Sequence, residues 1–318
     1  MYDIIAIGEL LMDFTPAGKS KRNNLLYECN PGGGVANLAA AAAKFGANVL
    51  FISKVGNDSF GHMLKDAVTT GGVDSSRIVF SGEYQTTLAF VHLFENGERD
   101  FTFYRRTGAD AMLRKEDVDF SLIANARLLH ISSLNMTNDT SADVIRSAVK
   151  KAKEFGVPVS YDPNWRPLLW TDEKTCKARM AEGLSLADII KAGEEELAYI
   201  TDEPDTETSA RKLLNNGARL VIVSKGESGS EYYHKNGSGS IDAVPVRAVD
   251  ATGAGDCYFG TALTLILKEI PDLDNIEESA LRRCLNIASA AAALCCTRKG
   301  GMPSMPTYSE AAELLQKH

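Results

Sequence analysis

Short apolar runs alternate with longer segments that carry apolar residues at helical spacing through most of the chain. Residues 2–8 form a buried-strand pattern that ends at a glycine. An alanine-rich segment at 35–46 favours a helix, and a strand pattern at 48–55 and a helix pattern at 61–71 follow it. This succession of strand, helix and strand predicts a parallel sheet covered by helices.

The same succession resumes after residue 110. Strands are predicted at 127–131, 157–162, 187–192 and 220–224, and helices at 139–155, 172–184, 194–201, 206–216 and 276–294. No internal repeat, linker or low-complexity tract interrupts the chain. We therefore predict an α/β fold in which residues 1–318 form a single domain.

One part of the N-terminal half departs from this rhythm. Residues 86–94 and 100–104 alternate between apolar and polar residues around an Asn96-Gly97 turn, a sequence typical of a β-hairpin. A hairpin inserted in a chain of strands and helices usually belongs to a separate small sheet. We expect that sheet to be a lid formed by about residues 11–32 and 84–108, because the first segment is also strand-prone.

A second hairpin pattern precedes the stretch with the clearest chemical character. Its expected strands are residues 230–234 and 240–244 around Asn236-Gly237, and an alternating, strand-like run spans residues 241–249. The sequence Asp250-Ala-Thr-Gly-Ala-Gly-Asp256 follows and leads into an apolar helix pattern at 257–270. The local prediction is therefore a strand, a glycine-rich turn, an aspartate and a helix.

Such a turn leaves backbone N–H groups unpaired at the positive end of the helix dipole. Because glycines let the backbone close on an anion, a phosphate or a developing oxyanion is the expected guest. Asp256 would stand beside that guest as an acceptor for a proton. This arrangement indicates a phosphoryl-transfer site.

Other interpretations of the turn also have to be weighed. An aspartate at a helix start often serves only as a cap, and short glycine motifs are common. The dinucleotide-binding fingerprint requires a third glycine where this chain has Tyr258. A nucleotide-binding P-loop ending at Gly18-Lys19-Ser20 would need a glycine where Asp13 stands. Neither of these two glycine-rich signatures applies.

The composition narrows the class of protein. Of the 318 residues, 44% are hydrophobic and 24% are charged, as in ordinary globular proteins, and the net charge of −8 disfavours a nucleic-acid scaffold. The N-terminus lacks the basic region and cleavage site of a signal peptide, and the small-residue run at 287–296 is too short to span a bilayer. The six cysteines include no Cys-x2-Cys pair. We expect them to be reduced in a cytoplasmic protein that binds neither nucleic acid nor membrane.

Three motifs carry a resemblance to a known family. Gly32-Gly-Gly-Val-Ala-Asn37, Lys54-Val-Gly-Asn-Asp-Ser-Phe-Gly61 and Asp250–Asp256 resemble, in this order, the motifs of the ribokinase-like (PfkB) carbohydrate kinases. Residues Tyr161–Arg166 and Ile190–Glu196 are similar to the corresponding segments of bacterial and plant fructokinases. The resemblance covers nearly the full length. It implies a three-layer α/β/α core with a mainly parallel sheet, and a small β-sheet lid.

The resemblance implies that Asp256 is the catalytic base and that the backbone of Gly253, Ala254, Gly255 and Asp256 is an anion hole. Phosphoryl transfer has a loose transition state, so positioning and charge stabilisation would supply most of the catalysis. The implied sugar contacts are Asp13, Gly33, Gly34, Asn37, Tyr104, Arg106, Asp162, Asn164 and Arg166. Arg166 would alternatively serve the phosphates, and for Arg105 a structural ion pair is the preferred interpretation.

The resemblance also implies a nucleotide side and two metal sites. The implied ATP contacts are Ser224, Gly226, Gly229, Gly253, Gly255 and Asn286. Glu196 would organise Mg²⁺ through water, although the family's asparagine three residues earlier is Gly193 here. The implied K⁺ ligands, beside the anion hole, are Asp250, Thr252, Cys295, Arg298, Gly300 and Ser304.

The favoured function is an ATP-dependent sugar kinase that converts D-fructose to fructose 6-phosphate. A 2-keto-3-deoxygluconate kinase is the alternative within the family, because Arg105-Arg106-Thr107-Gly108 stands where fructokinases commonly have Arg-Asn-Pro-Ser. Kinases of other sugars or of nucleosides rank lower. A non-catalytic sugar or nucleotide sensor is the alternative from another class, and an intact turn with Asp256 argues against it. The exposed edges and apolar face of a lid favour a homodimer formed through the lid.

Overall fold

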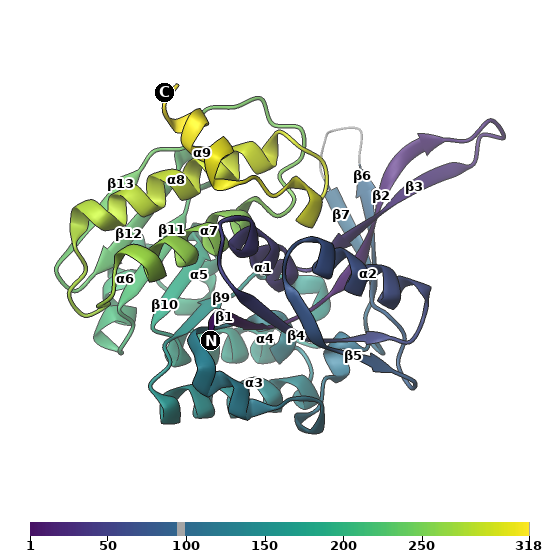
Figure 1. The fold of residues 1–318 in the computed structure, drawn as a ribbon, viewed down its shortest axis with the longest axis horizontal. Helices are drawn as coiled ribbons and strands as arrows, with labels where there is room; N and C mark the ends of the chain where they lie inside the picture. The colour runs from purple at the N-terminus through teal and green to yellow at the C-terminus, as the bar shows by residue number, and fades with distance from the viewer. Residues whose placement is uncertain (94–98, 318) are drawn as a thin grey trace.

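The computed structural model of the protein describes residues 1–93 and 99–317, so the expected Asn96-Gly97 turn lies outside the described residues. Its centre is a nine-stranded sheet with helices on both faces (Figure 1). The strand order is β13-β12-β11-β10-β9-β8-β1-β4-β5. Neighbours from β5 to β11 are parallel, while β12 and β13 are antiparallel additions at one edge. The bounds are β1 Tyr2–Ile7, β4 Val49–Gly56, β5 Asp74–Ser81, β8 Ala126–Ser132, β9 Val159–Asp162, β10 Ile189–Gly193, β11 Leu220–Ser224, β12 Ser230–His234 and β13 Gly237–Ile241.

The two faces of this sheet are covered by different sets of helices. Side chains alternate between faces along a strand, so Ile4 and Ala6 of β1 belong to one apolar core and Ile5 and Ile7 to the other. The first core is closed by α1 Gly34–Lys44, α2 Ser59–Thr70, α7 Ala254–Glu269, α8 Glu278–Cys296 and α9 Tyr308–Leu315. The second is closed by α3 Asp139–Phe155, α4 Glu173–Leu186, α5 Glu194–Thr201 and α6 Thr206–Asn215. The expected three-layer α/β/α core is confirmed.

The alanine run in α1 allows a close contact with α7. Ala39, Ala40, Ala41 and Ala42 are buried, and a Cβ atom built on Gly260 of α7 would lie 2.4 Å from the carbonyl oxygen of Leu38. Only small residues permit two helix backbones to approach in this way. The contact brings the N-terminal ends of α1 and α7 to the same place.

A second, four-stranded sheet has the order β3-β2-β6-β7. Its strands are β2 Leu11–Lys19, β3 Leu25–Gly32, β6 Leu88–Leu93 and β7 Arg99–Tyr104, all within the segments expected for a lid. The β2–β3 and β6–β7 pairs are antiparallel, and β2 pairs with β6 in parallel. The β2–β3 hairpin extends away from the body of the molecule (Figure 1).

The structure corrects the prediction for residues 240–249. Strand β13 begins at Gly237, directly after the two-residue turn of Lys235 and Asn236, and it ends at Ile241. Ile241 pairs with Ser230, the first residue of β12, so residues 242–249 have no strand left to pair with and are not a strand. The following helix begins at Ala254 rather than at 257. Strand β5 and helix α9 were not predicted, and the other expected elements begin and end within a few residues of their predicted bounds.

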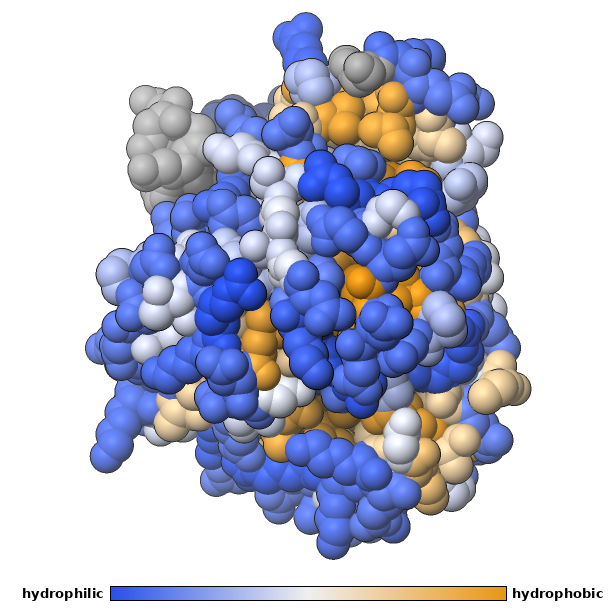
Figure 2. All heavy atoms as spheres, turned by 90° about the vertical axis from the view of Figure 1, so that its left-hand side faces the viewer, coloured by the Kyte–Doolittle hydropathy of each residue, from blue (hydrophilic) through white to orange (hydrophobic). Residues whose placement is uncertain are grey.

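Among the described residues, no helix combines the length and apolar character needed to cross a bilayer. The face shown in Figure 2 is largely hydrophilic, with apolar residues gathered in small patches.

Candidate active site

A cavity of about 370 Å³ lies at the carboxyl ends of the parallel strands, beside the small sheet and the start of α7. Ligands of open α/β sheets bind at this end because loops there converge on one crevice. Of the residues predicted for the site, the cavity lining contains Asp13, Gly33, Gly34, Asn37, Asn164, Arg166, Glu196, Thr252, Gly253, Gly255 and Asp256. Segments far apart in the sequence therefore meet here, as the resemblance implied.

Asp256 lies in the first turn of α7 and is held by α1. The Asn37 amide donates from Nδ2 to Asp256 Oδ2 at 2.9 Å. The pKa of Asp256 is raised to about 7, first by burial and then by the nearby negative charge of Asp162. The hydrogen bond from Asn37 and the positive charges of Lys191 and Arg166 act in the opposite direction and lower this pKa. The carboxyl group is therefore able to change protonation state near neutral pH.

The start of α7 is built to leave amides available. Gly253 adopts φ 79° at the N-cap, and no side chain caps the helix there. The Ala254 N–H donates to Ala251 O at 3.2 Å, and Cys257 N–H donates to Gly253 O at 2.8 Å. Ala254 is thus less suited to an anion hole than Gly255 and Asp256, whose amides belong to the same uncapped first turn.

Two glycines at the start of α1, the N-cap Gly33 and the first residue Gly34, make room for the polar groups opposite Asp256. Gly33 has φ 113°, and a Cβ atom on Gly34 would lie 2.2 Å from Asn164 Nδ2 and 3.3 Å from Asp256 Oδ1. Asn164 itself adopts φ 44° after β9, where its N–H donates to Asp162 Oδ1 at 3.1 Å. Any side chain at residue 34 would separate Asn164 from Asp256.

Asp13 of β2 reaches the cavity from the small sheet. The pKa of Asp13 is raised to about 7, mainly by burial. The positive charge of Arg166 lowers this pKa, and the negative charges of Asp250 and Asp256 raise it. Arg166 is exposed but lines the cavity, and its Nη1 donates to Trp165 O at 2.9 Å. Arg166 therefore supplies positive charge that favours the ionised forms of both Asp13 and Asp256.

Sequence reasoning missed Glu9, which follows β1 and is fully buried in the cavity wall. Its Oε1 accepts from Val35 N–H at 3.3 Å, and its Oε2 accepts from the Ser132 hydroxyl at 3.3 Å. Burial raises the pKa of this carboxyl. The available signal was its place, directly after a buried strand of a parallel sheet, because such positions border the ligand crevice.

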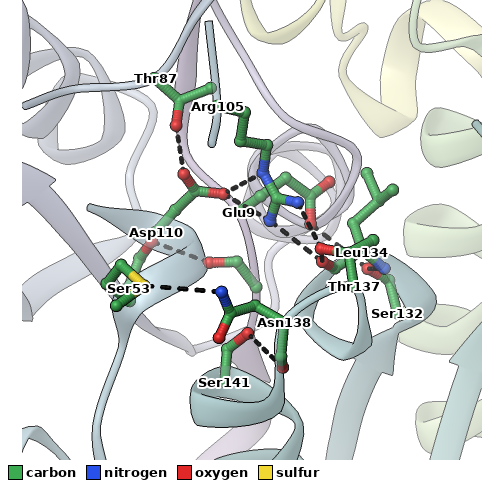
Figure 3. A network of polar contacts seen from close by, with 12 residues as sticks. Glu9, Ser53, Thr87, Arg105, Asp110, Ser132, Leu134, Thr137, Asn138 and Ser141 are labelled. Carbon is green, nitrogen blue, oxygen red and sulfur yellow. Dashed lines mark hydrogen bonds and ion pairs between the residues drawn. The ribbon is translucent and has the colours of Figure 1, made fainter. Parts of the chain in front are cut away.

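Arg105 lies beside Glu9 in a buried polar network (Figure 3). Its guanidinium forms a 2.7 Å ion pair with Asp110 and donates to Thr137 Oγ1 at 2.7 Å and Leu134 O at 3.0 Å. Asp110 in turn accepts from the Thr87 hydroxyl. The structural ion pair preferred for Arg105 is confirmed.

Two predicted sugar contacts of the small sheet lie away from the cavity lining. Phe103 lines the cavity, whereas its neighbour Tyr104 is 64% exposed and packs edge-on against the ring of Phe90. Successive side chains of a strand face opposite ways, so only one of the two can face the site. Arg106 is exposed in the turn after β7. The apolar lining by Phe103, Leu134 and Leu169 was not foreseen.

Of the predicted ATP contacts, Gly253 and Gly255 line the cavity, whereas Ser224, Gly226, Gly229 and Asn286 are not among its lining residues. Ser224 ends β11 and pairs in register with Gly193 of β10, which precedes Glu196 by one helical turn. Gly226 has φ 56°, and a Cβ atom built there would have no neighbour within 4 Å, so the loop after β11 has room for a ligand. Gly229 is required for packing, because a Cβ atom there would lie 2.1 Å from Ile241 O. Asn286 is half-buried on α8.

The surroundings of the Glu196 carboxylate are those expected of a residue that holds magnesium through water. Its Oε1 accepts from Trp165 N–H and its Oε2 from Gly193 N–H, both at 2.7 Å. Each carboxylate oxygen has a further lone pair, and Mg²⁺ commonly keeps several of its waters. The carboxylate therefore fits a water-mediated ion despite the glycine at residue 193.

The candidate K⁺ ligands meet at one junction beside α7. Asp250 Oδ1 accepts from Thr252 N–H at 2.9 Å, and Oδ2 accepts from Gly300 N–H at 3.2 Å. The Cys295 sulfur lies 3.8 Å from Thr252 O and 3.0 Å from Ser304 Oγ. The Arg298 N–H donates to Cys295 O at 3.1 Å. Carbonyl and hydroxyl oxygens of this kind suit a monovalent cation, and the K⁺ assignment stays a prediction.

Comparison with known proteins agrees with this geometry. A family model described as pfkB family carbohydrate kinase matches residues 1–308. The chain is 37% identical over 317 residues to Fructokinase-2 of Oryza sativa subsp. japonica, which covers 99% of this chain and 94% of the relative.

Solved structures give the same assignment. A fructokinase with bound ATP from Xylella fastidiosa has a TM-score of 0.91 at 31% identity, over 100% of this chain and 99% of that one. A fructokinase from Vibrio cholerae O395 in fructose, ADP and calcium ion bound form has a TM-score of 0.89 at 29% identity, over 99% of each chain. The present chain belongs to the pfkB family of carbohydrate kinases.

Proposed function

We propose that this protein is an ATP-dependent fructokinase that transfers the γ-phosphoryl group of ATP to D-fructose and forms fructose 6-phosphate. The observation that carries the proposal is the half-buried carboxylate of Asp256 at the uncapped start of α7, facing a polar cavity. The similarity to the Oryza fructokinase and to fructokinases solved with ATP and with fructose and ADP supports this choice of substrates.

Asp256 would accept the proton of the attacking sugar hydroxyl. Asn37 occupies its Oδ2 with a hydrogen bond, which leaves Oδ1 to face the cavity as the proton acceptor. The amides at the start of α7, chiefly those of Gly255 and Asp256, would stabilise charge on the transferring phosphoryl oxygens. Asp13, Asn37 and Asn164 would hold the sugar hydroxyls, with Asp162 and the two glycines 33 and 34 completing that side.

Two cations would support this chemistry. Glu196 would hold Mg²⁺ through water, where the ion neutralises phosphate charge on ATP. The junction of residues 250–252 with 295–304 would hold K⁺ and keep the glycine-rich turn in shape. Ser224, Gly226, Gly229 and Asn286 would border ATP on the side of β11 and α8.

The competing 2-keto-3-deoxygluconate kinase loses part of its support. That proposal depended on two adjacent arginines of the expected lid segment, directly after β7, which would bind an acidic substrate. Arg105 is committed to Asp110 and Thr137, so only Arg106 remains for a substrate carboxylate. Fructose is therefore the better substrate for this site.

An assay of sugar-dependent ADP release tests the proposed function directly. We expect turnover with fructose to exceed turnover with other hexoses, ribose, nucleosides and 2-keto-3-deoxygluconate, and to fall when K⁺ is replaced by Na⁺ or removed. Preference for 2-keto-3-deoxygluconate would transfer the assignment to that kinase. Binding of fructose without ADP release from any acceptor would indicate a sensor instead.

The Asp256→Asn variant tests the catalytic base. We expect it to retain binding of fructose and ATP but to lose about 10²–10⁴ in kcat, the usual worth of a positioned base. Asp172→Asn is the matched control, because Asp172 caps α4 by accepting from Thr175 N–H and is not among the cavity-lining residues described. Equal, near-normal turnover of both variants would show that Asp256 is not the catalytic base.

The pH dependence tests the same carboxylate in the unaltered protein. Because the pKa of Asp256 is raised to about 7, the group is protonated and inactive at lower pH and becomes a base as the pH rises. We expect kcat/KM to increase from about pH 5 to about pH 8 and then to level off. Asp13 also titrates near pH 7, so Asp13→Asn should make the rise less steep. A flat profile over this range would contradict the mechanism.

We also propose a homodimer formed through the small sheet. Leu25 and Leu26 at the far end of the β2–β3 hairpin are 64% and 44% exposed, and Tyr104 at the end of β7 is 64% exposed. These are exposed apolar side chains of the small sheet that a second copy would cover. Sedimentation velocity at micromolar concentration should detect the dimer, and Leu25→Asp should dissociate it. A monomer in the unaltered protein at that concentration would refute the dimer.

A further inference from the structure

Lys191 in β10 is a buried cation that the proposed mechanism leaves unused. The residue is 7% exposed and lines the cavity that contains Asp256. Its Nζ donates to Asp162 Oδ2 at 2.8 Å, which is its one hydrogen bond within the described part of the chain. An ammonium group has three N–H donors, so two are left for a ligand. Unsatisfied buried donors are unfavourable, and a bound anion would remove that penalty.

The ammonium lies directly beside the start of α7. A Cβ atom on Gly255 would be 3.0 Å from Lys191 Nζ and 3.7 Å from its Cε. Gly255 is the second residue of α7, where the helix dipole is positive. The absence of a side chain at residue 255 therefore serves a second purpose, because it lets a cation approach the uncapped amides.

The charges around Lys191 define where an anion can bind. Asp162 neutralises one side of the ammonium, and Glu196 and Asp256 are near enough to favour its charged form, so the pKa of Lys191 is raised although burial alone would lower it. Lys191 in turn favours the ionised form of Asp256. The free donors of Lys191 and the amides of α7 are thus positive groups next to the proton acceptor.

We propose that Lys191 is a further catalytic residue, whose ammonium binds the transferring phosphoryl group at the start of α7. The inference rests on the proposed kinase function. As the bond from phosphorus to the ADP oxygen breaks and the bond to the sugar oxygen forms, the hydroxyl proton passes to Asp256. Lys191 keeps all its protons and stabilises the negative charge that the phosphoryl oxygens carry.

The simpler explanation is that Lys191 only neutralises Asp162, and the chain offers a matched case of that kind. Lys54 of β4 is 6% exposed, and its Nζ lies 2.7 Å from Asp117 Oδ2. Its second contact is the Met112 carbonyl oxygen at 3.3 Å, and it is not among the cavity-lining residues described. Lys54 therefore has the buried ion pair without the site.

Steady-state kinetics of Lys191→Met and Lys54→Met, with fructose and ATP, separate the two explanations. We expect Lys191→Met to lose about 10²–10³ in kcat, which is the effect of removing one donor to transition-state charge. The KM of Lys191→Met for fructose should stay within about threefold of the value for the unaltered protein. The kcat of Lys54→Met should also stay within about threefold of the unaltered protein's kcat. The thermal unfolding temperature of both variants measures how much stability is lost with the buried ion pair, separately from the effect on catalysis.

A second comparison covers the case in which Lys191→Met does not fold. Lys191→Met combined with Asp162→Asn leaves no unpaired buried charge, and Asp162→Asn alone is its reference. We expect kcat of the double variant to lie about 10²-fold or more below that reference. Equal kcat in the two, a normal kcat in Lys191→Met, or an equal loss in Lys54→Met would overturn the inference. Absence of ADP release from the unaltered protein would instead refute the kinase function on which the inference rests.

Discussion

The contact between α1 and α7 is the constraint on which the site depends. Alanines of α1 and Gly260 of α7 let the two helices approach until the Leu38 carbonyl would touch a side chain at residue 260. Both helices begin at the same edge of the large sheet, so their first turns meet. The Asn37 hydrogen bond to Asp256 is the direct result, and it joins residues that are 219 positions apart.

Around that contact the cavity balances several buried charges. Asp256, Asp162, Asp13 and Glu9 are carboxylates in or beside a largely buried space, and an unpaired charge there would be strongly unfavourable. Lys191 forms an ion pair with Asp162, and Arg166 attracts Asp13. Arg105 forms its ion pair with Asp110. The balance leaves two aspartates with a pKa raised to about 7 rather than fully ionised, which suits a proton acceptor that works near neutral pH.

The glycines of the motifs are required for different structural reasons. Gly34 admits Asn164 and Asp256 to the same point, and Gly255 admits the Lys191 ammonium to the start of α7. Gly229, in contrast, is needed because the carbonyl of Ile241 packs against it. A glycine in a family motif is therefore not always next to a ligand, and only the neighbours in space tell the two cases apart.

The sequence by itself determined the order of strands and helices apart from β5 and α9, the existence of a second small sheet, and the glycine-rich turn before Asp256. These features depend on short-range patterns, namely hydrophobic period, turn residues and helix propensity, which neighbouring residues reveal. Only the tertiary structure decided that residues 242–249 are not a strand, because β12 has no further residues to pair with them. It also decided that Phe103 rather than Tyr104 faces the cavity, and that Glu9 and Lys191 belong to the site. Each of those outcomes depends on which segments, distant in the sequence, pack against the residue in the folded protein. The local sequence pattern does not indicate those segments.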